Sequence, residues 1–87
     1  MPRTRDLRRY LFQRLRDNDR QPLTFDEIMQ IAYHTTTPDQ RRIDLHALHK
    51  MVEHGAVLME GTDQPEDPYR YRINPKASRD YPYDHSQ

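Results

Sequence analysis

Hydrophobic residues in the first part of the chain recur at the spacing of a helix. Between residues 4 and 18 they fall every three or four positions, on one side of an amphipathic helix. They are Leu7, Tyr10, Leu11 and Leu15. The far side of this predicted helix carries a basic strip of Arg5, Arg9 and Arg16. One side therefore suits a core, and the other suits solvent or an anionic partner.

Two further helices are predicted to begin at capping boxes. In such a box a threonine side chain, and a glutamate or glutamine three residues later, bond backbone N–H groups of the first turn. Thr24 opens the first of these helices and Thr37 opens the second. Pro38 takes the first helical position of the second, where its missing N–H costs nothing. We expect that helix to span residues 38–54, because Gly55 fits the left-handed residue that ends helices.

The helix over residues 38–54 is long enough for its two sides to be distinguished. Its predicted buried side consists of Ile43, Leu45, Ala47, Leu48, Met51 and Val52. Its predicted outer side consists of Arg42, His46, His49, Lys50 and Glu53. Lys50 and Glu53 stand three residues apart, a spacing that allows a surface ion pair on a helix.

After Gly55 the pattern changes to that of a hairpin. Residues 56–60 and 69–73 read as strands, joined by a polar loop that contains two prolines. In the second strand Tyr69, Tyr71 and Ile73 face one way and the two arginines the other. Pro75 ends that strand, since proline cannot continue a ladder. We therefore expect one domain over residues 1–75, followed by a flexible tail over residues 76–87.

The composition limits what the chain can do. Its 87 residues suffice for one domain, and only 33% are hydrophobic, so the core must be small. The absence of cysteine excludes disulfides and thiolate metal sites. No apolar stretch approaches the ~20 residues of a membrane span, so we expect a cytoplasmic protein without membrane contact. Nucleophile motifs and glycine-rich phosphate loops are missing, so we expect neither an enzyme nor a cofactor.

The net charge is zero, but the charges are unevenly distributed. Residues 1–20 hold seven arginines and three aspartates, a net charge of +4, whereas residues 21–60 are net acidic. A nucleic-acid-binding protein can be neutral overall if its basic residues gather on one face. For nucleic-acid binding, the position of the basic residues therefore matters more than their number.

The order of these elements resembles the winged helix-turn-helix family over residues 4–75. The resemblance rests on Thr24-Phe25-Asp26-Glu27-Ile28, on Thr37-Pro38-Asp39-Gln40, on residues 51–59 and on the strand over residues 69–73. It implies an α+β fold of three helices with a C-terminal β-hairpin, the wing. It also implies a DNA-binding protein, a small transcriptional regulator whose helix 38–54 reads the major groove and whose wing touches phosphates.

The resemblance assigns DNA contacts to ten positions of this chain. They are Thr36, Thr37, Gln40, Arg41, Arg42, His46, His49, Lys50, Arg70 and Arg72. Arginine can bond guanine with two hydrogen bonds, and glutamine can do the same with adenine. Threonines at a helix N-terminus can bond phosphate. The expected partner is double-stranded DNA, and a homodimer would add discrimination by reading two half-sites.

Other readings stay open. The predicted loop carries Asp63, Glu66 and Asp67, which would repel phosphates, so the alternative is a protein-interaction module that does not bind DNA. The cations on helix 38–54 would then form a solvated face with local ion pairs. His46 and His49 share a face, but no cysteine is available to complete a zinc site, so we expect no metal. The tyrosines of the second strand suit a packing face better than a platform for bases.

Overall fold

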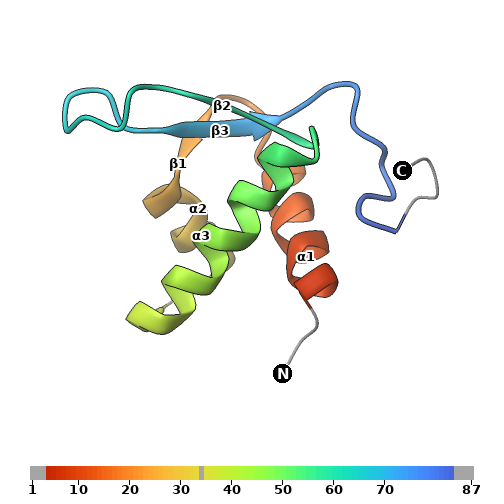
Figure 1. Cartoon of the computed structure of the whole chain (residues 1–87), viewed down its shortest axis with the longest axis horizontal. Helices are drawn as coiled ribbons and strands as arrows, with labels where there is room; N and C mark the ends of the chain where they lie inside the picture. The colour runs from red at the N-terminus through yellow and green to blue at the C-terminus, as the bar shows by residue number, and fades with distance from the viewer. Residues whose placement is uncertain (1–3, 34, 84–87) are drawn as a thin grey trace.

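The computed structural model describes residues 4–33 and 35–83. Within them the chain forms three helices and a three-stranded antiparallel sheet, a small α+β fold (Figure 1). The elements in chain order are α1 (Thr4–Asp17), β1 (Leu23–Thr24), α2 (Phe25–Ala32), α3 (Pro38–Glu53), β2 (Val57–Glu60) and β3 (Arg70–Ile73). The predicted α+β class, with three helices followed by a hairpin, is confirmed at this level.

The sheet has the order β1-β3-β2, so β3 lies in the middle. It crosses one end of the helices, and the loop between β2 and β3 extends past them (Figure 1). The segment before α2 contributes the two residues of β1, with Leu23 paired to Tyr71. Because Leu23 and Tyr71 are buried, one face of the sheet packs against the helices.

The helix boundaries follow local chemistry. The capping box at Thr24 is complete: its side chain accepts from the Glu27 N–H at 3.2 Å, and the Glu27 carboxylate accepts from the Thr24 N–H at 2.8 Å. At α3 only half of the predicted box forms. Thr37 accepts from the Gln40 N–H at 3.1 Å, but the Gln40 side chain bonds a different partner. Gly55 ends α3 with φ +79°, in the left-handed region, as expected.

That different partner is Asp44, which is completely buried in the core-facing side of α3. Gln40 Nε2 donates to Asp44 Oδ1 at 2.7 Å, because a buried carboxylate needs donors more than the helix start needs a second cap. Burial raises the pKa of Asp44, and hydrogen bonding from Gln40 and Tyr33 partly opposes this. Burial, with the nearby Asp44 charge, raises the pKa of Tyr33. The other carboxylate oxygen, Asp44 Oδ2, is buried and has no donor among the described residues at the distance and angle of a hydrogen bond.

The predicted buried side of α3 is confirmed for Ala47, Leu48 and Met51, which are buried together with Asp44. It is wrong for Ile43, which is 45% exposed. Leu45 and Val52 are half-buried, and Val52 packs against the core.

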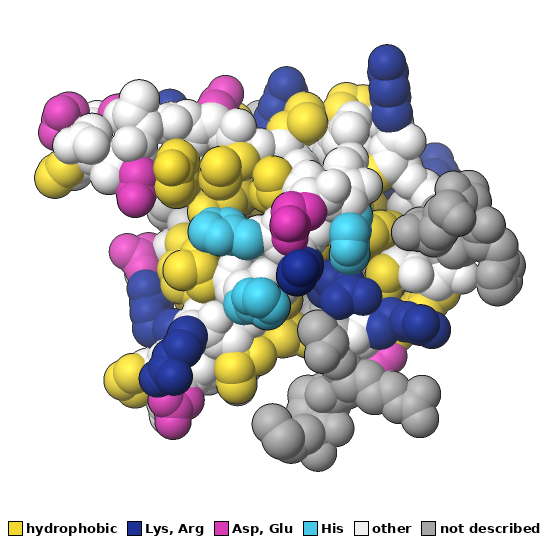
Figure 2. All heavy atoms as spheres, viewed as in Figure 1, with side chains coloured by type: hydrophobic (Ala, Val, Ile, Leu, Met, Phe, Trp, Pro, Cys, Tyr) yellow, Lys and Arg dark blue, Asp and Glu magenta, His cyan; other side chains and the backbone are white. Residues whose placement is uncertain are grey.

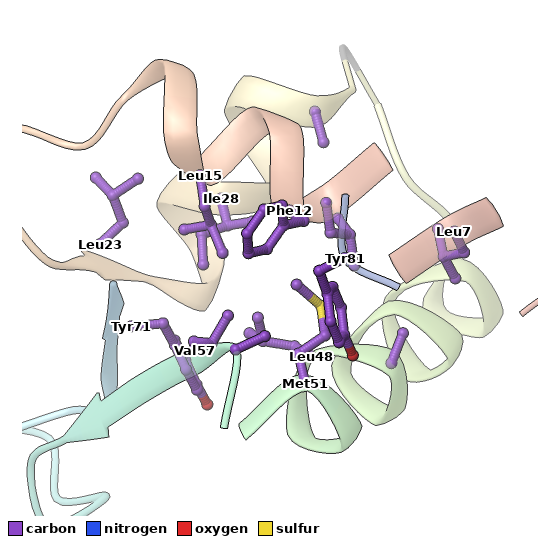
Figure 3. Packing of buried hydrophobic residues seen from close by; sticks show 14 of the residues in the cluster. Leu7, Phe12, Leu15, Leu23, Ile28, Leu48, Met51, Val57, Tyr71 and Tyr81 are labelled. Atoms are coloured by element: carbon purple, nitrogen blue, oxygen red, sulfur yellow. The ribbon is translucent and has the colours of Figure 1, made fainter. Parts of the chain in front are cut away.

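The core lies between the three helices and the inner face of the sheet (Figure 3). Its largest buried side chains include Tyr71 of β3 and Phe12 of α1, with Leu48 and Met51 supplied by α3. Their removal from water is the main source of stability in so small a domain.

The packed chain continues beyond the predicted boundary at residue 75. Tyr81 is only 4% exposed, and its ring lies 5.3 Å from that of Phe12, between α1 and α3 (Figure 3). Its hydroxyl lies 2.7 Å from His54 Nδ1, and Arg9 Nη1 donates to its carbonyl at 2.8 Å. The predicted tail therefore includes one packed aromatic side chain, since a single ring can fill a cleft without any sequence periodicity. The remainder of that predicted tail, residues 84–87, lies outside the described residues.

Candidate nucleic-acid interface

The outer side of α3 brings four of the predicted contact residues together. Positions 42, 46, 49 and 50 fall opposite the buried positions because the helix repeats every 3.6 residues. Arg42, His46 and His49 are exposed and Lys50 is half-buried. Figure 2 shows histidine and basic side chains gathered on this face of the molecule. We call Arg42, His46, His49 and Lys50 the α3 face.

The start of α3 is less available for contact with DNA than the sequence implied. The Thr37 hydroxyl caps the helix, and the side-chain amide of Gln40 donates to the Asp44 carboxylate. Thr36 is half-buried beside a pocket of about 210 Å³ at the α2–α3 turn. The turn can offer backbone groups to a phosphate, but the Gln40 side chain is committed inside the chain.

Two cations of the α3 face are held by weak surface ion pairs. Arg42 Nη2 lies 2.7 Å from the Asp39 carboxylate, and Lys50 Nζ lies 3.3 Å from the Glu53 carboxylate, the pair that the helical spacing suggested. The Arg42 and Asp39 side chains are 78% and 82% exposed. Pairs this exposed are worth about 0–1 kcal/mol, so either cation can exchange its carboxylate for a phosphate at small cost.

Arg41, also a predicted contact, is engaged more firmly. Its guanidinium bonds the Asp26 carboxylate of α2 and lies 5.0 Å from the centroid of the Phe25 ring. Both interactions draw Arg41 toward α2. Arg41 therefore joins α3 to α2 and is not part of the α3 face.

The structure does not bring Arg70 and Arg72 onto the α3 face. They alternate with Tyr71, whose side chain is buried toward the helices and whose hydroxyl lies 3.1 Å from His49 Nε2. Both arginines therefore belong to the opposite face of the sheet. Arg70 is held by Asp67 at 3.2 Å and Glu60 at 3.7 Å. Arg72 is exposed and forms no ion pair within the described part of the chain.

No family model, curated protein or solved structure matches this chain. The site must therefore be judged on its own residues. No group of three or more histidine or acidic side chains in residues 4–33 and 35–83 could hold a metal ion. None of the described helices is long and apolar enough to cross a membrane.

The basic strip of α1 serves the packing of the C-terminal segment. Arg9 donates to the Tyr81 carbonyl, and Arg5 lies 6.0 Å from the centroid of the Tyr83 ring. Arg16 is exposed at the other end of the strip. In residues 4–33 and 35–83, no hydrogen bond, ion pair or ring contact joins Arg16 to the C-terminal segment.

Sequence reasoning missed a groove beside the α3 face. It has a volume of about 330 Å³ and lies between the start of α2, the middle of α3 and the β2–β3 loop. Phe25, Tyr69 and Tyr71 contribute aromatic rings to it. The alternation of Tyr69 and Tyr71 in the predicted second strand was a usable signal, but only the fold brings Phe25 to the same place.

Proposed function

We propose that this chain is a winged helix-turn-helix domain that binds double-stranded DNA as a transcriptional regulator, with α3 in the major groove. The element order of helix, short strand, helix, turn, helix and hairpin is compatible with this layout. The observation that carries the proposal is the α3 face, which is exposed along a 16-residue helix and presents two exchangeable cations. The major groove admits an α-helix, and helical side chains can reach the base edges.

The geometry also sets the expected strength of binding. Arg42 and Lys50 stand two turns apart, about 12 Å along the axis, so each can meet a different phosphate or base. Two neutralised phosphates give a slope of log K against log salt of about −1.8, and a second copy bound to the same duplex would double it. The affinity of one copy should therefore be modest, and it should fall about ten-fold between ~50 and ~200 mM salt.

The test uses fluorescence anisotropy of a labelled random-sequence duplex, titrated with the full chain from ~50 to ~200 mM salt, since phosphate contacts weaken across this range. Arg42→Ala is expected to weaken binding and to reduce the salt slope by about 1. Arg72→Ala removes the same charge from the opposite face of the sheet and is the matched control. Absence of binding at the lowest salt refutes the proposal. An equal loss with both variants refutes the assignment to the α3 face.

A second candidate is a protein-interaction module, and one observation favours it. Of the five predicted basic contacts, Arg41, Arg42, Lys50 and Arg70 are already paired with carboxylates of the chain. Such a surface is nearly neutral, and its cations would serve the fold and its solubility. Failure to bind DNA in the titration above would leave this candidate in its place.

A further inference from the structure

The groove beside α3 combines aromatic rings with carboxylates. Phe25, Tyr69 and Tyr71 line it together with Asp26 and Asp63. Figure 2 shows hydrophobic side chains between the hairpin and the histidines of α3, with acidic side chains at their edge. The volume of about 330 Å³ is at the small end of the usual range for small-molecule sites, about 300–1,000 Å³.

The groove lining already holds a cation of the chain. The Arg41 guanidinium lies over the Phe25 ring, 5.0 Å from its centroid, and bonds the Asp26 carboxylate. An aromatic face is negative and attracts a cation, and the carboxylate adds to that attraction. Asp26 and Arg41 neutralise each other, so this pair neither attracts nor repels a further charge strongly.

Two tyrosines and a second carboxylate also line the groove. Tyr69 is half-buried, and Tyr71 is buried with its hydroxyl 3.1 Å from His49 Nε2. Asp63 has φ +64°, a conformation that aspartate tolerates better than most residues. Asp63 forms no ion pair with any residue that the structure describes. Burial, together with the nearby Asp63 charge, raises the pKa of Tyr71 to about 12.

We propose that the part of the groove formed by Tyr69, Tyr71 and Asp63 binds a small organic cation, an alkylammonium or quaternary ammonium ion. The half-buried Tyr69 ring supplies a negative face, the buried Tyr71 ring belongs to the apolar wall, and Asp63 supplies the unpaired charge. An anion is repelled by Asp63, and a neutral molecule of the same size gains nothing from it. The inference does not depend on DNA binding, because neither Tyr69 nor Asp63 belongs to the α3 face.

The experiment is an NMR titration of the isotope-labelled full chain, observed by its backbone amide signals. The probe is tetramethylammonium chloride. Sodium chloride at equal ionic strength controls for salt, and tert-butanol controls for an uncharged molecule of similar size. We expect saturable shifts of groove residues with tetramethylammonium alone. Shifts that do not saturate, or that tert-butanol reproduces, overturn the proposal.

Variants locate the site. Asp63→Asn removes the charge but keeps a residue that tolerates positive φ, and Tyr69→Leu removes a ring but keeps an apolar side chain. Each is expected to weaken tetramethylammonium binding about two- to five-fold, the size of one exposed cation–aromatic or charge contact. Glu66→Gln makes the same change of charge in the same loop, away from the groove lining, and should leave binding unchanged. If the Glu66 variant loses as much affinity as the Asp63 variant, the loop attracts cations generally and no site exists. The amide spectrum of each free variant shows whether it is folded, and an unchanged affinity in a folded Tyr69→Leu also refutes the site.

Discussion

Replacement of Tyr81 by alanine tests whether the segment after residue 75 belongs to the folded domain. The side chain is 4% exposed and packs against Phe12, so its removal leaves a cavity between α1 and α3. Comparable truncations of buried aromatic residues cost about 3–5 kcal/mol. A domain of this length has about 4–13 kcal/mol of stability in total, so the loss would be a large fraction of it. Tyr81→Phe keeps the ring and loses the hydroxyl near His54, which should cost only about 0.5–1.5 kcal/mol.

The assay is urea unfolding followed by far-ultraviolet circular dichroism at a fixed pH and temperature. Tyr83→Ala is the matched control, because Tyr83 lies two residues away, is 42% exposed and contacts α1 only at the surface, through Asp6 and Arg5. It should be clearly less destabilising than Tyr81→Ala, because truncations of exposed side chains have small effects. Should Tyr81→Ala be no more destabilising than Tyr83→Ala, the packing role given to residues 76–83 is refuted and the domain ends at residue 75.

Two further predictions concern single positions. Because the pKa of Asp44 is raised in the folded chain, the stability that its neutral form provides is present below its unfolded pKa and is lost as pH rises through the folded pKa. The free energy of unfolding of Asp44→Asn, measured relative to the parent chain, should therefore increase from pH 4 to pH 7, and a difference that does not vary with pH contradicts this. The two glycines have positive φ, but a Cβ at Gly61 would lie 2.4 Å from the Pro68 carbonyl oxygen, whereas at Gly55 it meets nothing within 4 Å. In urea unfolding, Gly55→Ala should lower the free energy of unfolding by about 1 kcal/mol, and Gly61→Ala should lower it clearly more. Equal losses of stability would show that the loop moves to relieve the clash.

The parts of the fold that could be predicted from the sequence are those decided by neighbours along the chain. The start of α2 depends on Thr24 and the end of α3 on Gly55, and both lie within a few residues of the boundary that they set. β1 could not be predicted as a strand, since two residues become one only by pairing with β3. Asp44 could not be placed inside by any hydrophobic pattern. Its burial depends on donors from Gln40 and Tyr33, and Tyr33 reaches it only in the folded chain.

The same distinction applies to the candidate interface. The spacing of three residues predicted the Lys50–Glu53 pair, but the Arg41–Asp26 pair joins two helices and depends on their packing. Its formation removes from the α3 face a cation that the resemblance assigned to DNA. The interface that remains is smaller and closer to neutral than the sequence implied.

The hairpin shows how a correct local prediction can limit a functional one. The alternation in β3 correctly separated Tyr71 from its two arginine neighbours. Once Tyr71 is buried beneath α3, those arginines must lie on the far face of the sheet, because successive side chains of a strand point in opposite directions. Contact between the hairpin and a duplex held by α3 would then come from the β2–β3 loop. The acidic residues of that loop, Asp63, Glu66 and Asp67, repel phosphates. The proposed DNA binding therefore has to be carried by α3, and the loop is better suited to attract a cation than to hold a nucleic acid.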